Sequence, residues 1–376
     1  MKNSIQGIQS NRNLFHPFIG FCFLLLSQII QAKDFSIVTV ADGLDHPWSI
    51  AFLPNNDMLV TERVGNLRII REGKLLQQKI SGLPELFVRG QGGLMDVILD
   101  PDYVNNKTLY LSYSSGSRND NTLKVIRAKL VDMSLQQTKV ILTIIAGRDT
   151  PHHYGARMVF LKDGTLLVTS GDGFNYREQA QNLKSMFGKI LRINSDGSIP
   201  QDNPFVGRKD VLPEIYSYGH RNPQAILLSA DGKIWQHEHG PKGGDELNLI
   251  KPGLNYGWPA ITYGVDYSGA IISPYHKAKG MQQPVTYWVP SIAPSGMTEY
   301  QGDIFPQWKG NLFVAALAER SVRRLILKAG KVTKQEIMLK ELNQRIRDIR
   351  TGPDGYLYVL TDSDSGSVLR LQPVKE

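Results

Sequence analysis

The sequence predicts an all-β fold and, within that class, a six-bladed β-propeller of four-stranded antiparallel blades. Six segments share one rhythm, in which a turn rich in Asn, Asp and Gly leads into a short strand of β-branched and apolar residues. Such turn residues favour hairpins. Each segment follows another short apolar strand, and no long amphipathic helical pattern separates them. The repeat recurs about every 45 to 80 residues, the scale of one blade with insertions.

The first element, residues 1–32, is predicted to be a secretory signal peptide. Two basic residues and no acid precede the apolar stretch FIGFCFLLLSQII, which is too short to span a membrane comfortably, and Ala32 offers a small-residue cleavage site. We expect the mature protein to begin near Lys33 and to reside in the periplasm or outside the cell. An uncleaved anchor is the alternative. Cys22 is the only cysteine, so the mature chain must rely on its core, its topology or bound metal instead of disulfides.

Residues 33–376 are predicted to form the propeller as a single domain. Hydrophobic residues make up 41% and charged residues 21% of the chain, as in an ordinary soluble globular protein. The formal net charge is +8, but no run of five or six Lys or Arg occurs. We therefore expect neither a nucleic-acid partner nor stable membrane insertion of the mature protein. A two-sheet sandwich is the alternative fold, and the propeller is favoured because radial packing protects sheet edges.

The paired strands also predict where a site should lie. The first strand of each pair is expected at residues 48–53, 94–99, 156–161, 224–229, 296–301 and 346–351. A polar cluster stands immediately before each of these strands. Because equivalent positions of successive blades lie on one ring around the propeller axis, we expect the clusters to converge at one mouth of the central channel. The ring residues are His46, Gln91, His153, Arg221, Asn222, Ser291, Arg345 and Arg347.

The ring indicates an anionic ligand and a candidate base. Arg221, Arg345 and Arg347 can each pair a carboxylate or phosphate through two parallel hydrogen bonds, although exposed surface arginines are the alternative. No Walker loop or strand–GxGxxG–helix unit supports a conventional nucleotide site. His153, which follows His152, can accept a proton near neutral pH. A structural histidine bonded to a neighbouring loop is the alternative.

The stretch WQHEHGPKGGDELN, residues 235–248, predicts a cation site. Its Gly- and Pro-rich turn bends the chain tightly and exposes carbonyls, and Asp245 and Glu246 add carboxylates. Carbonyls with carboxylates suit a hard cation such as Ca²⁺, and an acidic turn without metal is the alternative. His237 and His239 alternate on a strand and so face one way, but no third soft ligand for zinc is evident.

Several longer stretches together resemble a known family. They are LDHPWSIAFLP, RGQGGLMDVILDPDY, IYSYGHRNPQ, EHGPKGGDELN, NYGWP, PSGM and QRIRDIRTGPDGYLYVLTD. Nearly all of the chain after residue 32 resembles the soluble, periplasmic aldose sugar dehydrogenases that use pyrroloquinoline quinone (PQQ), within the glucose/sorbosone dehydrogenase family. The resemblance implies a six-bladed propeller with PQQ over the channel mouth, and oxidation of an aldose sugar at its anomeric C1 hydroxyl to the lactone.

The resemblance also implies roles for individual residues. His153 would be the general base while hydride passes from C1 to PQQ. The carbonyls of Gly240 and Pro241 would hold a Ca²⁺ on PQQ, and Glu246 and Tyr256 would hold a second, structural Ca²⁺. PQQ is planar and carries three carboxylates, which fits a ring with three arginines and a cation. The implied cofactor contacts are Gln91, Arg221, Asn222, Tyr267, Ala316, Leu317, Ala318, Glu319, Arg345, Ile346 and Arg347.

Two positions depart from the family pattern. Relatives often carry Asn or Asp before the catalytic histidine, where this chain has His152. Some carry a cofactor-contacting Lys where this chain has Ala318, which leaves Glu319 or Arg320 as the candidate for that contact. A calcium-dependent propeller lactonase and a non-catalytic binding propeller are the alternative functions. The sequence leaves the preferred sugar and the electron acceptor unidentified, and it is compatible with a monomer or a homodimer.

Overall fold

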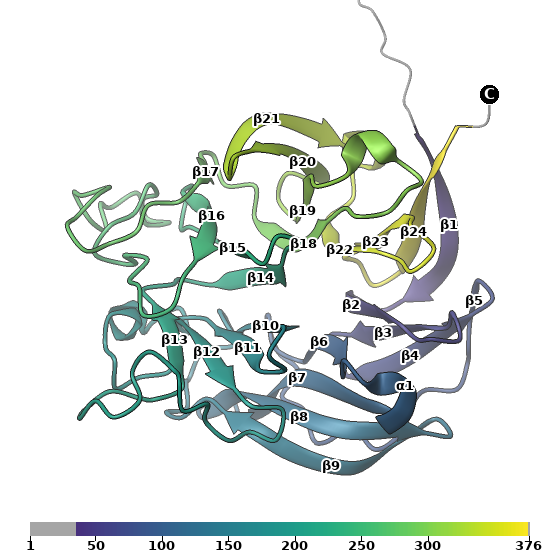
Figure 1. Cartoon of the computed structure of the whole chain (residues 1–376), viewed down its shortest axis with the longest axis horizontal. Coiled ribbons are helices and arrows are strands. Elements are labelled where there is room, and N and C mark those ends of the chain that lie inside the picture. Colours follow the sequence, from purple (N-terminus) through teal and green to yellow (C-terminus); the bar gives the residue numbers. More distant parts are fainter. Residues whose placement is uncertain (1–34, 375–376) are drawn as a thin grey trace, which may run out of the picture. The chain divides into compact units, whose positions relative to one another are not determined.

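The computed structural model describes residues 35–374, and these form six four-stranded antiparallel sheets around a centre (Figure 1). The predicted six-bladed propeller is therefore confirmed, with inner strands that begin within about two residues of the predicted positions. The predicted signal peptide lies outside the described residues. Blade by blade, the strands are β2 (Pro47–Phe52), β3 (Met58–Glu62), β4 (Asn66–Arg71) and β5 (Lys74–Leu75); β6 (Leu94–Leu99), β7 (Thr108–Gly116), β8 (Asn121–Val131) and β9 (Ser134–Thr143); β10 (Gly155–Phe160), β11 (Leu166–Ser170), β12 (Lys189–Ile193) and β13 (Ile215–Tyr218); β14 (Pro223–Leu228), β15 (Ile234–Glu238), β16 (Asp245–Ile250) and β17 (Thr286–Trp288); β18 (Pro294–Glu299), β19 (Leu312–Ala316), β20 (Ser321–Lys328) and β21 (Lys331–Met338); and β22 (Ile346–Thr351), β23 (Leu357–Thr361), β24 (Gly366–Pro373) and β1 (Phe35–Leu44).

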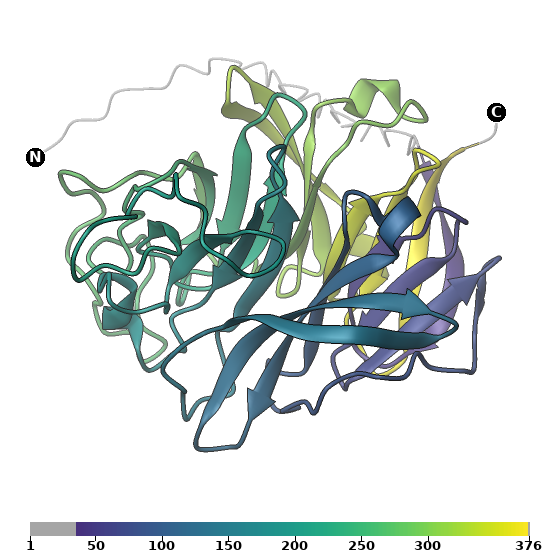
Figure 2. The same cartoon turned by 60° about the horizontal axis from the view of Figure 1, so that its bottom comes forward.

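Helical structure is confined to short turns in the described part of the chain. None of these helices is long and apolar enough to cross a membrane. The turned view in Figure 2 brings blade two, with its long strands β8 and β9, to the front. The helical segments are α1 (Tyr103–Asn106) and the 3₁₀ turns η1 (Arg177–Ala180), η2 (Pro306–Trp308) and η3 (Lys340–Leu342).

The ring is closed by pairing strands from the two ends of the described chain. Strand β1 adds to blade six as its outermost strand and runs antiparallel to β24, with Phe35 opposite Pro373 and Ile37 opposite Leu371. Since residues 35–374 contain no cysteine, these backbone hydrogen bonds and the core beneath them hold the two ends together without a disulfide.

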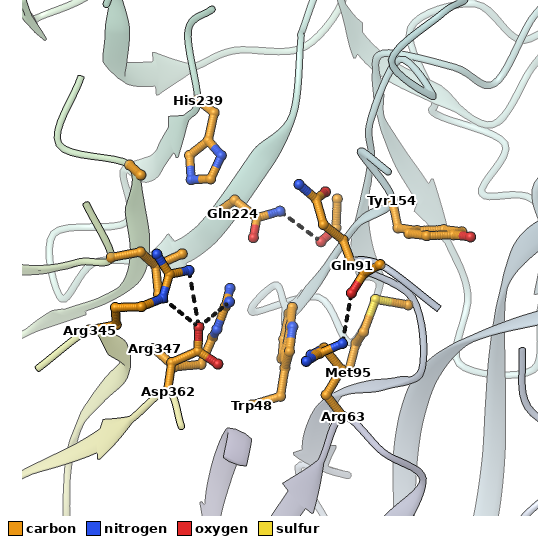
Figure 3. A pocket seen from close by; sticks show the side chains of 14 residues that line it. Trp48, Arg63, Gln91, Met95, Tyr154, Gln224, His239, Arg345, Arg347 and Asp362 are labelled. Atoms are coloured by element: carbon orange, nitrogen blue, oxygen red, sulfur yellow. Dashed lines mark hydrogen bonds and ion pairs between the residues drawn. The ribbon is translucent and has the colours of Figure 1, made fainter. Parts of the chain in front are cut away.

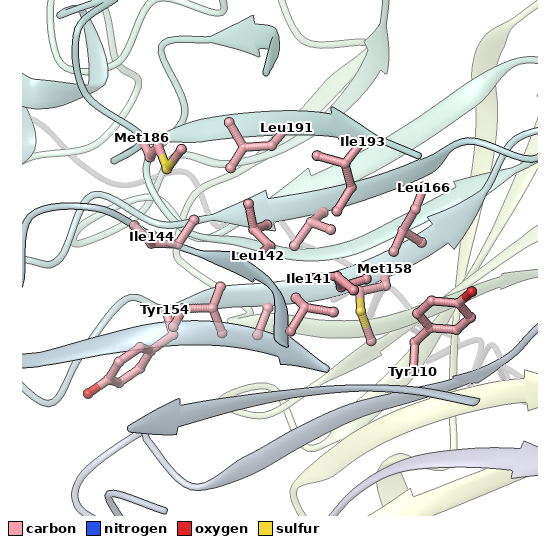
Figure 4. Close-up of a cluster of buried hydrophobic side chains, with 14 of the residues drawn as sticks. Tyr110, Ile141, Leu142, Ile144, Tyr154, Met158, Leu166, Met186, Leu191 and Ile193 are labelled. Atoms are coloured by element: carbon pink, nitrogen blue, oxygen red, sulfur yellow. The ribbon is translucent and has the colours of Figure 1, made fainter. Parts of the chain in front are cut away.

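Six apolar clusters fill the spaces between neighbouring blades. Figure 4 shows the cluster between blades two and three, where Tyr110 and Leu142 meet Met158 and Leu191. The other five clusters join the remaining neighbouring pairs in the same way. Each blade therefore buries its faces against the next, which is what a ring of repeats requires.

The inner strands share a β-bulge near their first residues. The pairing register of β2 shifts between Pro47 and Ser49, and that of β10 shifts between Gly155 and Met158. Similar shifts occur in β6, β14, β18 and β22. A bulge bends its strand and re-aims nearby side chains. All six bulges lie at the end of the inner strands where the predicted polar clusters stand.

One buried side chain, Arg157 of blade three, contacts a residue from every other blade. Its guanidinium lies 4.0 Å from the Trp48 ring centre and within ion-pair distance of Asp96 and Asp348. Arg350 bridges the same two carboxylates, so two positive and two negative charges balance at the axis. The remaining contacts of Arg157 are hydrogen bonds to the carbonyls of Gln224, Ser295 and Arg347.

Replacing this hub should destabilise the propeller. Arg157→Met leaves two buried carboxylates to share Arg350, and removing one partner of a buried ion pair costs about 3–5 kcal/mol. Chemical denaturation measures the effect, with Arg157→Lys as the variant that keeps the charge but loses the planar fork. The double variant Arg157→Met/Asp96→Asn should recover part of the loss. A free energy of unfolding unchanged in Arg157→Met would contradict the hub role.

Candidate active site

A cavity of about 310 Å³ lies at the bulged end of the inner strands (Figure 3). Its size falls at the lower end of the range for small-molecule sites, about 300–1,000 Å³. All six blades contribute to its walls, as the predicted ring requires. The lining residues are Trp48, Arg63, Gly90, Gln91, Met95, Tyr154, Gly155, Gln224, His239, Ala293, Leu317, Arg345, Arg347 and Asp362.

The predicted ring is only partly gathered at this cavity. Gln91, Arg345 and Arg347 line it directly. Two ring positions take up other roles: His46 bonds to the neighbouring Asp45, and the hydroxyl of Ser291 donates to Asp245.

His153 and Asn222 belong to the wall behind the lining residues. The backbone N–H of His153 donates to Gln91 Oε1 at 2.8 Å, and that of Gly155 donates to Asn222 Oδ1 at 3.2 Å. His153 lies in the loop that precedes β10. Its backbone φ of +53° is unusual for a residue other than glycine. A strained backbone conformation persists where several contacts hold it. Here Arg148 adds one such contact, because it donates to the His153 carbonyl at 2.9 Å.

His153 forms a buried pair with Asp172. The distance between His153 Nδ1 and Asp172 Oδ1 is 2.7 Å, and both side chains are almost fully buried. Asp172 Oδ1 also accepts from the Phe174 backbone N–H, and its Oδ2 accepts from Trp258 Nε1, both at 2.8 Å. Because an ionised carboxylate only accepts, His153 must donate from Nδ1, which leaves Nε2 with the lone pair of a base.

The surroundings set the charge of this pair. Burial, then the nearby Arg221, lower the pKa of His153 to about 4, against the opposing effect of Asp172. Burial alone would raise the pKa of Asp172, but His153, Arg221 and the Phe174 N–H outweigh it and the pKa lies below its ordinary value. At neutral pH the pair therefore consists of a neutral imidazole and a carboxylate, the state that a general base needs.

Two cavity arginines share one carboxylate. Arg345 and Arg347 each donate to Asp362 Oδ2, at 3.2 and 3.0 Å. Burial would raise the pKa of Asp362, but the two arginines lower it below its ordinary value. The Nε of Arg347 and the Nδ2 of Asn222 are buried and have no partner in the described structure. Buried donors of this kind are costly unless an acceptor fills them, so this wall fits a ligand rich in acceptor oxygens.

Arg221 and Tyr267 line a neighbouring cavity of about 340 Å³. The Arg221 guanidinium lies 5.3 Å from the Trp258 ring centre and 5.8 Å from that of Tyr267. Phe174, which also touches the His153 ring edge-on, stacks with Tyr267 at 6.4 Å. Phe174 thus belongs both to the wall of this cavity and to the surroundings of the candidate base.

Three of the four predicted calcium residues line a third cavity. Its volume is about 10 Å³, room for a single water-sized particle, and Gly240, Glu246 and Tyr256 line it together with Glu238. Pro241 lines the aromatic-walled cavity beside it. Glu238 and Glu246 stand directly opposite each other on β15 and β16, and burial followed by the Glu238 charge raises the pKa of Glu246 well above its ordinary value.

The carboxylates and carbonyls of this cavity suit a hard cation, and Arg221, which also lines it, is the one positive side chain beside them. The carbonyl of Gly240 accepts from Arg221 at 2.6 Å but retains a second lone pair. The Tyr256 hydroxyl is already bonded to Leu249 and Lys251, so Tyr256 would offer its carbonyl. Within residues 35–374 no cluster of three or more His, Cys, Asp or Glu could hold a metal. A cation here would therefore depend on backbone oxygens as well, as Ca²⁺ commonly does.

The segment around Ala318 contributes less than expected. Leu317 lines the 310 Å³ cavity, whereas Ala316 is buried between blades four and five, and the Ala318 N–H donates to a carbonyl of its own blade. Glu319 pairs with Arg323 at 2.6 Å. Arg320 donates to Asn343, and the Ile346 side chain is buried while its carbonyl accepts from Ser295. Neither Glu319 nor Arg320 lines the 310 Å³ cavity.

Sequence reasoning did not recognise a second ring of site residues, of which it had named only Leu317 as a cofactor contact and His239 as a possible metal ligand. The residue that follows the second strand of a blade lines the cavity in four blades: Arg63, His239, Leu317 and Asp362. Asp172 stands one position further along in blade three. In an antiparallel pair the start of the first strand lies beside the end of the second. The residues at the ends of the second strands could therefore have been predicted from the same repeat.

Comparisons with known proteins agree with the fold. The family model described as Glucose / Sorbosone dehydrogenase matches residues 44–370. The chain is 43% identical to the aldose sugar dehydrogenase YliI of Escherichia coli (strain K12), over 90% of this chain and 93% of that protein. It is 29% identical to the quinoprotein glucose dehydrogenase B of Acinetobacter calcoaceticus, over 91% and 90%.

A solved structure extends the comparison to three dimensions. The PQQ-bound form of the aldose sugar dehydrogenase from Streptomyces coelicolor matches this structure with a TM-score of 0.74 at 27% identity, covering 90% of this chain and 98% of that one. The family model alone spans most of the propeller. The chain belongs to the glucose/sorbosone dehydrogenase family.

Proposed function

We propose that the protein is a PQQ- and calcium-dependent dehydrogenase that oxidises aldose sugars at the C1 hydroxyl to the lactone. The observation that carries this proposal is the buried His153–Asp172 pair, which lies behind the wall of a cavity lined by three arginines. The named activities of the Escherichia coli and Acinetobacter relatives and the PQQ-bound Streptomyces structure support it. We further propose that the enzyme is exported and works in the periplasm or outside the cell.

The cavity residues suit a planar tricarboxylate. Arg345 and Arg347 line the cavity and would each pair with a carboxylate of PQQ, and Asn222 behind the lining is a further candidate contact. Gln91 and Leu317 line the same cavity, and Arg221 and Tyr267 would approach PQQ from the neighbouring one. When bound, PQQ supplies the two-electron acceptor that takes hydride from C1 of the sugar.

The remaining chemistry belongs to side chains of this protein. His153 Nε2 would take the proton of the C1 hydroxyl as the C1–H bond breaks, so that one proton and one hydride leave the sugar and a C=O bond forms. Asp172 holds the Nδ1–H and would stabilise the imidazolium that results. Phe174 and Tyr267 would shield the reacting atoms from water beside the base.

The proposal is tested by titrating the purified protein with PQQ in the presence of Ca²⁺ and then adding sugars. Saturable binding, followed by a sugar-dependent change in the absorption of the bound quinone and reduction of an added dye, is expected. Hydrolysis of a lactone without PQQ would support the propeller lactonase instead. That reading needs a metal held by axial carboxylates, yet Asp96 and Asp348 at the axis are already paired with arginines. Binding of a ligand without turnover would leave a binding propeller.

We propose two calcium sites, one formed by the Gly240 and Pro241 carbonyls next to the cofactor and one at Glu246 and Tyr256. The structure adds Glu238 as a further candidate ligand, because it shares the small cavity with Glu246. A divalent cation would relieve the repulsion between these two buried carboxylates.

Removing calcium should therefore destabilise the protein. An ion that binds only the folded state at 100 times its Kd stabilises it by about 2.7 kcal/mol. We expect chelation to lower the Tm and added Ca²⁺ to restore it. Glu246→Gln should lose part of this calcium response, while Glu85→Gln, an exposed control, keeps it in full. The same Ca²⁺-dependent Tm shift in Glu246→Gln and wild type would rule out a cation at this carboxylate.

A further inference from the structure

We propose that Arg63, a cavity residue of blade one to which the sequence assigned no role, binds a carboxylate of the cofactor. The inference rests on the proposed function and adds a fourth arginine to the three predicted from the ring. Arg63 directly follows β3. In Figure 3, Trp48 of the inner strand β2 lies between Arg63 and the blade-six residues Arg345 and Arg347.

Arg63 is built into the cavity wall by its backbone. Its N–H donates to the His46 carbonyl at 3.0 Å, and its own carbonyl accepts from the Leu94 N–H at 3.2 Å. The adjoining Gly93 allows this approach, since a Cβ there would lie 1.8 Å from the Arg63 carbonyl oxygen. The start of the side chain is therefore fixed between blades one and two.

The guanidinium of Arg63 is charged and only partly used by the protein. One nitrogen, Nη1, donates to the Gly90 carbonyl at 2.7 Å, and no carboxylate lies within ion-pair distance of Arg63 among residues 35–374. Figure 3 shows the side chain beside Gln91 and Trp48 in the cavity. A guanidinium has five N–H donors, so donors remain for a ligand.

Arg63 changes the net charge of the cavity lining. Arg345 and Arg347 share Asp362, so those three side chains together carry one net positive charge. His239 is neutral, because burial and then Arg221 lower its pKa well below the ordinary value. Arg63 raises the net charge of the lining residues to two. A ligand with several carboxylates gains a separate partner at Arg63, while Asp362 partly neutralises the arginines of blade six.

The experiment measures equilibrium binding of PQQ to calcium-loaded, sugar-free protein. Arg63→Met should weaken PQQ binding about 10- to 100-fold, the loss of one charge-assisted contact. Arg63→Lys keeps a point charge without the planar fork, so its PQQ affinity should lie between those of the wild type and Arg63→Met. Arg208→Met removes the same charge from a residue that lines none of the cavities described above, and its affinity should match wild type. Thermal unfolding of each variant checks that all are folded.

A second experiment tests whether Arg63 binds a carboxylate of the sugar substrate instead of one of PQQ. At saturating PQQ, the KM of Arg63→Met for a neutral aldose and for the matching uronic acid should change by the same factor. The inference is overturned if PQQ affinity in Arg63→Met equals that in Arg208→Met, or if only the KM for the uronic acid rises. If wild-type protein binds no PQQ while it is folded and calcium-loaded, the proposed function fails and this inference fails with it. Normal wild-type binding with an unaffected Arg63→Met removes this inference alone.

Discussion

His153→Ala should fold, bind Ca²⁺ and take up PQQ, yet reduce the bound quinone with sugar about 10²–10⁴-fold more slowly, the usual cost of losing a positioned general base. The side chain supplies the Nε2 lone pair, because Nδ1 donates to Asp172. Its removal leaves the arginines of the cavity in place, so cofactor affinity should change little. Single-turnover absorption of the bound PQQ after mixing with sugar measures the effect directly.

Two histidines serve as controls for this assignment. His152→Ala should be much milder, since His152 contacts Phe174 beside the base and has no carboxylate partner in the described structure. His239 lines the cavity, but its Nε2 donates to the Pro294 carbonyl at 2.8 Å, which leaves only Nδ1 as a base. If His239→Gln abolishes turnover and His153→Ala does not, the base has been assigned to the wrong histidine.

The pH dependence gives an independent check on the same residue. Because the pKa of His153 is lowered to about 4, kcat/KM should stay level through pH 6.5, the ordinary range of histidine, and fall only near pH 4. The value of kcat/KM falls at acid pH because protonation removes the Nε2 lone pair that accepts the proton. Replacing Arg221, which lowers this pKa, should move the acid limb upward. An acid limb near pH 6.5 in the wild-type enzyme would show that the base is a solvent-exposed group instead.

Asp172→Asn should also cost about 10²–10⁴-fold in sugar oxidation, through the wrong tautomer of His153. Both carboxylate oxygens accept: Oδ1 from His153 and the Phe174 N–H, and Oδ2 from Trp258. An amide must turn its NH₂ toward one of these donors. If the NH₂ faces His153, Nδ1 becomes the acceptor and Nε2 carries the proton, so the base is lost.

Trp258→Phe is the matched control for Asp172→Asn. It removes the donor at Oδ2 but keeps the carboxylate and the His153 contact, so turnover should fall far less. The acid limb should move to lower pH in Asp172→Asn, because Asp172 raises the pKa of His153. Equal turnover in Asp172→Asn and wild type, with PQQ bound in both, would show that the pair is structural.

The sequence by itself determined the blades and one ring of the site. Alternating turns and apolar strands are local patterns, and their recurrence is enough to predict six blades because each blade repeats the same pairing. The same register correctly brought Gln91, Arg345 and Arg347 to one cavity. The ring also indicated His153 as a candidate base and Arg221 as an anion partner, and the family resemblance added the PQQ contacts of Arg221 and Asn222.

The tertiary structure decided what depends on residues distant in the chain. Strand β1 completes blade six only once the ring has closed. Asp172, Asp362 and Arg63 enter the site from the ends of second strands, next to first strands that sequence analysis had already placed. Arg157 joins all six blades by contacts such as the one with Arg347, 190 residues away in the sequence. The low pKa of His153 likewise arises from burial and from Arg221 of another blade, because desolvation and Coulombic interaction depend on what surrounds a group in space.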